Sequence, residues 1–151
     1  MTKIEMFQQL VDYRINSITR ICDMIKIDFS SNEKELCLHV QSALFRVVKQ
    51  DKLLISSNDI YVPSVNYIAK RFKKFKWDVP GNTLFDDCLQ KIISKMLGKK
   101  VVSVNYDGQD LIINLEGQER IEIISNTLEK ECEKFRLFVK GDIDSHIVVE
   151  T

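Results

Sequence analysis

The chain has 151 residues, 44% of them apolar and 29% charged, and its formal net charge is zero. These values are ordinary for one soluble globular domain with a sizeable core. The sequence has no run of about 18 apolar residues, and this excludes a membrane-spanning helix. Glu5 and Gln8 interrupt the N-terminal segment where a secretory signal needs an unbroken apolar region, so we expect a cytoplasmic protein.

Two-residue alternation of apolar and polar side chains predicts antiparallel strands through the first third of the chain. Residues 3–11 precede them with the apolar spacing of a short helix. The strands are expected at residues 14–21, 24–30, 36–41, 45–47 and 53–55. Pro63 ends this strand-rich part.

A long amphipathic helix is predicted from Thr83 to Leu97. Asn82 or Thr83 can cap its start, and two acidic residues fall in its first turn, where the helix dipole favours them. Gly98 stands just past its end, as expected for a helix C-terminus. The apolar residues between these limits form one broad stripe.

The second half of the chain repeats the pattern of the first. At an offset of 86, residues 10–29 match residues 96–115 with the apolar phase preserved, for example Ile15 with Val101. An offset of 85 then pairs Leu36 with Ile121, and after an insertion Phe45 meets Phe135. Two ordinary meanders that coincide by chance are the alternative to a duplication.

We therefore predict a single α+β domain over residues 1–151. It contains two pseudo-repeated antiparallel β-meanders, in lobes at residues 10–62 and 96–151. The basic segment and the long amphipathic helix, residues 63–97, join them.

Charge is distributed unevenly along the chain. Residues 63–100 contain nine basic and three acidic residues, whereas residues 101–151 contain five basic and eleven acidic residues. The two regions could dock on each other, or the acidic region could meet a basic partner protein. The acidic residues that we consider for partner binding are Glu129, Glu131, Glu133, Asp142 and Asp144.

A basic and aromatic run at residues 67–77 has the composition of a nucleic-acid patch, since cations neutralise phosphates and rings stack on bases. The sequence pI of about 6.7 argues against a dedicated nucleic-acid binder. We prefer a solvated face or an intramolecular docking segment. Lys73 and Lys74 of this run are further candidates for contact with a partner protein.

The sequence contains no motif that identifies an active site. Asp78, Asp86 and Asp87 flank one loop and the start of the long helix, where carboxylates could bind a divalent cation or share a proton, with His39 as a further group. We prefer the interpretation that these aspartates cap the turn and complement the helix dipole. The four cysteines lack the short spacing of metal ligands, so we expect no metal and no cofactor.

Several short motifs carry a resemblance to a family of small bacterial proteins of unknown function. They are a leucine-histidine-aliphatic-glutamine stretch, an aromatic-arginine pair, an aspartate-aromatic-proline turn, a tryptophan-aspartate pair and an asparagine-phenylalanine-aspartate stretch. These motifs lie at residues 38–41, 45–46, 59–63, 77–78 and 82–86. The chain departs from the pattern at Phe135, where tryptophan is usual. Some proteins of this kind are similar to immunity proteins of bacterial toxin systems, which implies inhibition by binding, with no turnover.

The leading hypothesis is a cytoplasmic module that binds a partner protein, with a toxin-immunity protein as its specific form. A metal-dependent hydrolase that uses the aspartates with His39 is one alternative. The other is a homo-oligomer, such as a homodimer, that forms through an exposed sheet edge.

Overall fold

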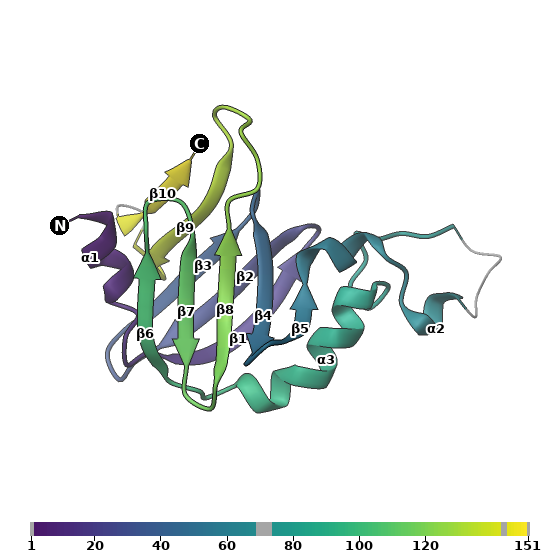
Figure 1. The fold of residues 1–151 in the computed structure, drawn as a ribbon, viewed down its shortest axis with the longest axis horizontal. Coiled ribbons are helices and arrows are strands. Elements are labelled where there is room, and N and C mark those ends of the chain that lie inside the picture. The colour runs from purple at the N-terminus through teal and green to yellow at the C-terminus, as the bar shows by residue number, and fades with distance from the viewer. Residues whose placement is uncertain (1, 69–73, 143–144, 151) are drawn as a thin grey trace.

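The computed structural model describes residues 2–68, 74–142 and 145–150, and it shows two antiparallel sheets of five strands each (Figure 1). Sheet A has the strand order β1-β2-β3-β9-β10, and sheet B has the order β5-β4-β8-β7-β6. The strands of sheet A are β1 (Arg14–Ile21), β2 (Met24–Ser30), β3 (Glu35–Val40), β9 (Glu133–Val139) and β10 (Ile147–Glu150). The strands of sheet B are β4 (Leu44–Lys49), β5 (Lys52–Ser56), β6 (Val101–Tyr106), β7 (Leu111–Leu115) and β8 (Glu119–Ile124). The predicted α+β fold is confirmed.

The helices lie beside and between the sheets. They are α1 (Lys3–Gln8), the 3-10 helix η1 (Ser57–Tyr61), α2 (Val65–Ile68) and α3 (Leu84–Met96). Thr83 caps α3, because its hydroxyl accepts a hydrogen bond from the Asp86 amide and the Asp86 carboxylate accepts one from the Thr83 amide. The helix predicted from Thr83 to Leu97 is therefore confirmed, and Thr83 rather than Asn82 is the cap.

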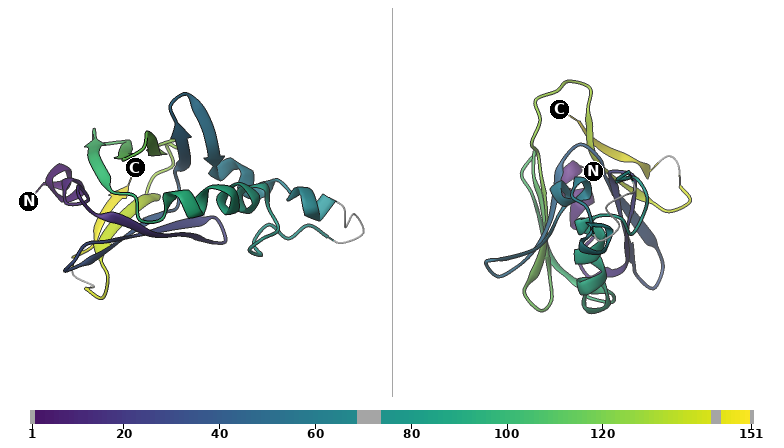
Figure 2. Two further views of the ribbon diagram at one scale, coloured as in Figure 1. Left: turned by 90° about the horizontal axis from the view of Figure 1, so that it is seen from below. Right: turned by 90° about the vertical axis from the view of Figure 1, so that its right-hand side faces the viewer.

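The core lies between the two sheets. The alternating apolar residues of each strand face inward, and Ile25, Ile27 and Phe29 of β2 are fully buried. Figure 2 shows the sheets as two layers with α3 between them. Each longer helix contributes one buried phenylalanine: Phe7 of α1 contacts rings from both sheets, and Phe85 of α3 faces Phe45 of sheet B.

The two sheets have the same topology, and each sheet contains three strands from one half of the chain and two strands from the other half. A three-strand meander from the first half, β1-β2-β3, is completed by the hairpin β9-β10 from the second half. The meander β8-β7-β6 is completed in the same way by the hairpin β4-β5. The two lobes expected at residues 10–62 and 96–151 are therefore interleaved rather than separate.

The start of β1 also pairs with the chain just before β6, so one corner joins the two sheets. The two residues bridged there, Arg14 and Lys100, are matched with each other by the sequence offset of 86. Both β1 and β6 carry a register irregularity at the same place, after Ile15 and after Val101. This correspondence is one of topology, and duplication of an ancestral half stays a prediction.

The strand registers correct the expected match in the third strand of each meander. Ile27 of β2 pairs with Leu38 of β3, while Ile113 of β7 pairs with Ile121 of β8. Since Ile27 corresponds to Ile113, Leu38 corresponds to Ile121, which the offset of 85 had assigned to Leu36. The apolar phase did not reveal the difference, because a shift of two residues keeps each side chain on the same face.

Candidate functional site

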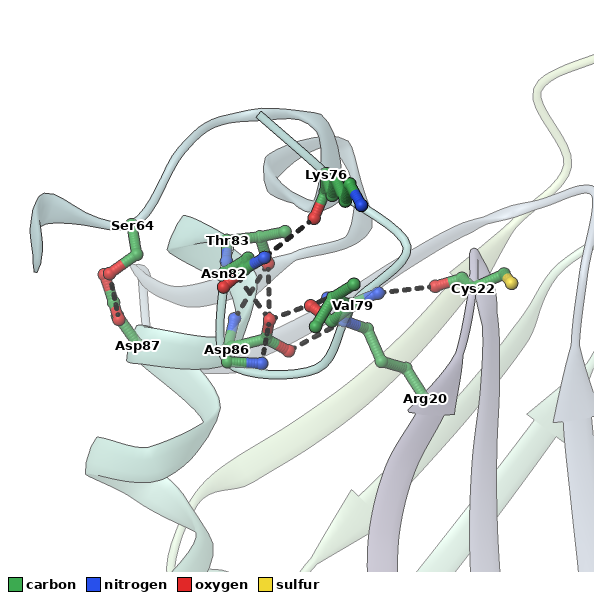
Figure 3. Close-up of polar contacts among 10 residues, drawn as sticks. Arg20, Cys22, Ser64, Lys76, Val79, Asn82, Thr83, Asp86 and Asp87 are labelled. Atoms are coloured by element: carbon green, nitrogen blue, oxygen red, sulfur yellow. Dashed lines mark hydrogen bonds and ion pairs between the residues drawn. The ribbon is translucent and has the colours of Figure 1, made fainter. Parts of the chain in front are cut away.

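Asp86, one of the three aspartates considered for catalysis, belongs to a buried ion pair at the start of α3 (Figure 3). Both carboxylate oxygens accept hydrogen bonds of 2.7 Å from the guanidinium of Arg20 on β1. The Arg20 side chain is 2% exposed and also donates to the carbonyls of Cys22 and Val79. Burial would raise the pKa of Asp86, but the hydrogen bonds from Arg20 and Thr83 lower it below its ordinary value. These contacts fasten α3 to sheet A.

The other two aspartates lie in different surroundings. Asp87 accepts hydrogen bonds from the hydroxyl of Ser64 at 2.9 Å and from the amide of Val65 at 3.1 Å, and so holds the start of α2 (Figure 3). Asp78 is exposed in the loop before α3. Within the described ranges, no three His, Cys, Asp or Glu side chains are grouped so that they could hold a metal ion. The structure thus does not bring the proposed aspartate site together.

His39 lies on β3, on the outer face of sheet A, rather than beside the aspartates. It is opposite Arg136 in the strand register, and the centroid of its ring lies 4.9 Å from that of Phe138, with the two rings nearly perpendicular. Its Nε2 atom is buried without a hydrogen-bond partner in the described part of the chain. Burial, and then the nearby Lys26 cation, lower the pKa of His39, so the ring is neutral around pH 7.

The residues considered for partner binding are scattered. Glu133 is paired with Arg136, Glu131 is exposed, and Asp142 lies in the exposed turn after β9. Lys74 is exposed, and its carbonyl accepts a hydrogen bond from the hydroxyl of Tyr67. Lys73 and Asp144 lie outside the described residues. Among the candidates that the structure describes, Glu129 lines a cavity formed by several segments of the chain.

That cavity lies where the two halves of the fold differ. The loop between β8 and β9, residues 125–132, has eight residues, whereas its counterpart between β3 and β4, residues 41–43, has three. In Figure 1 the β8–β9 loop projects beyond the sheets, and α2 lies to one side of them. Loops on a rigid scaffold are where binding residues concentrate.

The cavity has a volume of about 240 Å³. Four segments line it: the β1–β2 turn, the β3–β4 join, η1 and the β8–β9 loop, which together we name the loop end. The lining includes the side chains of Asp23, Ser42, Asn58, Asn126, Glu129 and Cys132. Carboxylates, amides and a hydroxyl thus meet here although they are far apart in the sequence.

Hydrogen bonds hold the walls of the loop end in place. The hydroxyl of Tyr61 on η1 donates a hydrogen bond of 3.1 Å to Asp23 on the β1–β2 turn. The centroid of the Tyr61 ring lies 5.0 Å from that of the Trp77 ring. Burial, and then the bond to Asp23, raise the pKa of Tyr61. At the base of the β8–β9 loop, Ser125 donates from its amide to Asp110 at 2.8 Å.

The loop end also presents large apolar groups to solvent. Tyr61 is 52% exposed, and Leu128 in the β8–β9 loop is 94% exposed. A second cavity, of about 490 Å³, shares Asn126 and Thr127 with the first and includes Leu128. Exposed aromatic and apolar side chains beside polar pockets are typical of surfaces that bind other molecules.

Sequence reasoning missed Arg20, Asp23 and Tyr61 as functional or organising residues. Tyr61 belongs to the aspartate-aromatic-proline motif, which the sequence presents only as a turn. The usable signal was the greater length of the β8–β9 loop compared with the β3–β4 join, since residues of that loop line the cavity. Arg20 gave no signal, because its partner Asp86 is 66 residues away.

Comparison of the chain with family models, with curated proteins and with solved structures finds no match in any of the three. The resemblance to bacterial immunity proteins therefore stays a prediction. Among the residues that the structure describes, no helix has the length and apolar character needed to cross a membrane.

Proposed function

We propose that this protein works by binding another protein, and that the loop end is its binding surface. The observation that carries the proposal is the cavity formed by four distant segments, bordered by the exposed Tyr61 and close to the exposed Leu128. Tyrosine and tryptophan are over-represented among the residues that dominate binding energy, and Tyr61 and Trp77 lie together here.

The polar lining of the cavity supports the same proposal. The side chains of Ser42, Asn58 and Asn126 make no hydrogen bond to another part of the described chain. Such groups can bind water in the free protein and exchange it for a partner's polar groups. Two aspartates of the hydrolase alternative are instead engaged within the fold, Asp86 with Arg20 and Thr83 and Asp87 with Ser64.

An immunity protein, which silences a bacterial toxin by binding it in the cytoplasm, is the kind of binding protein that we propose. This specific form rests on the sequence resemblance.

A tagged pull-down from the native lysate, at low and moderate salt, tests the proposal. We expect one stoichiometric partner, captured by the wild type and lost with either Tyr61→Ala or Leu128→Asn. Leu53→Asn is the matched control, because Leu53 is 50% exposed on β5 near the β4–β5 turn, away from the loop end. Recovery of the protein alone, or equal capture by all four proteins, would overturn the proposal.

A further inference from the structure

The cavity at the loop end is small for a metabolite. Its volume of about 240 Å³ lies below the range of about 300–1,000 Å³ that is usual for sites of drug-sized ligands. It is large enough for a single extended side chain. A partner protein that covers the loop end can therefore place one residue in it.

The charges that line the cavity are of one sign. Asp23 and Glu129 contribute carboxylates, and no Lys, Arg or His of the described chain is part of the lining. One oxygen of Asp23 accepts the hydroxyl hydrogen of Tyr61, which leaves its other oxygen for a ligand. The Glu129 side chain makes no hydrogen bond or ion pair within the described ranges. Two carboxylates at one small cavity favour a cation.

The uncharged groups of the lining suit the same ligand. Gln41, Asn58 and Asn126 offer amide oxygens, which accept hydrogen bonds from an ammonium or a guanidinium. The ring of Tyr61 can pack against an aliphatic stem, and its face attracts a cation. Arginine, with five donors in a planar fork, can use several of these acceptors at once.

We propose that this cavity binds a lysine or arginine side chain of the partner protein, with the charged group taken up by Asp23 and Glu129 and the stem beside Tyr61. The inference rests on the proposed function and names the chemistry that the partner must present. It also gives a role to Glu129, one of the acidic residues of the region 101–151.

Capped amino acids test the chemistry without the partner. N-acetyl-arginine amide and N-acetyl-lysine amide are titrated into the ¹⁵N-labelled protein, with the uncharged N-acetyl-citrulline amide and N-acetyl-norleucine amide as comparison probes. We expect the cationic probes to shift the amide signals of Asn58, Tyr61 and Asn126 with millimolar half-saturation. The neutral probes should need at least a tenfold higher concentration for the same shift.

A double variant, Asp23→Asn with Glu129→Gln, should weaken binding of the cationic probes at least fivefold. Glu131→Gln is the matched control, because Glu131 is an exposed carboxylate of the same loop that does not line the cavity. Equal shifts by the neutral probes, unchanged binding by the double variant, or shifts confined to other residues would each overturn the inference.

The same variants separate this inference from the proposed function. In one outcome Tyr61→Ala loses the partner, the double variant retains it, and the cationic probes do not shift the amide signals of the loop end. The loop end is then the binding surface, but its cavity does not bind a cation. If the probes bind as expected but the partner is captured equally by all variants, the cavity takes a cation and the proposed surface for protein binding is wrong.

Discussion

The ion pair between Arg20 and Asp86 gives the sharpest test of how the fold is held together. Asp86→Asn keeps the shape of the side chain but removes the charge that neutralises Arg20. Arg20 is 2% exposed and Asp86 13% exposed at the side-chain level, so the guanidinium would stay buried without its carboxylate. Removing one member of a buried pair costs about 3–5 kcal/mol.

We expect a loss near the lower end, about 3 kcal/mol, because the carbonyls of Cys22 and Val79 still accept hydrogen bonds from Arg20. For a chain of this length that corresponds to a fall in Tm of about 6–12 °C. Urea unfolding followed by circular dichroism measures the difference. Asp78→Asn is the control, since Asp78 is exposed, and its stability should stay within about 0.5 kcal/mol of the wild type.

The pH dependence of the same pair provides a second measurement. The folded pKa of Asp86 lies below its ordinary value of 3.8, since the bonds from Arg20 and Thr83 outweigh burial. A carboxyl group of this kind stabilises the protein fully above its unfolded pKa and loses that contribution as the pH falls through the folded pKa. The stability difference between wild type and Asp86→Asn should therefore be complete at pH 7 and shrink below about pH 4. A difference under about 1 kcal/mol at pH 7 would refute the assignment of a structural ion pair.

Three further outcomes follow from burial and capping. Phe45→Ala and Phe135→Ala should each cost about 3–5 kcal/mol in urea unfolding, because both rings are fully buried, and unchanged stability in both would contradict the core. Thr83→Ala should cost about 1 kcal/mol through loss of the cap of α3, and a cost near zero in the same assay would show that the cap is dispensable. Iodoacetamide at pH 8 should modify the exposed Cys22 in the native protein and spare the buried Cys37. Burial and the hydrogen bond to Asp28 raise the pKa of the Cys37 thiol to about 12. Peptide mass spectrometry identifies the modified cysteine, and rapid modification of Cys37 would argue against its burial.

The candidate site illustrates what a sequence pattern conceals. Glu129 was singled out for its charge alone, and among the described members of the acidic group it is the one that lines the cavity at the loop end. Asp86 was considered for catalysis, and its role is the capping and helix-dipole role that the pattern favoured, with Arg20 as an additional partner. The sequence shows which residues are charged, but it does not show which residue each charged side chain contacts.

The sequence by itself determined the local elements: the strand Arg14–Ile21, the helix that follows Asn82 or Thr83, and the α+β class. These follow from periods of two and 3.6 residues and from capping chemistry, which act within a few residues. Only the tertiary structure decided that the two halves exchange hairpins, that Leu38 corresponds to Ile121, and that Tyr61 reaches Asp23. Apolar alternation is the same for every strand order and for any register shifted by two residues. Long-range packing of the core therefore selected one arrangement among those that the pattern allowed.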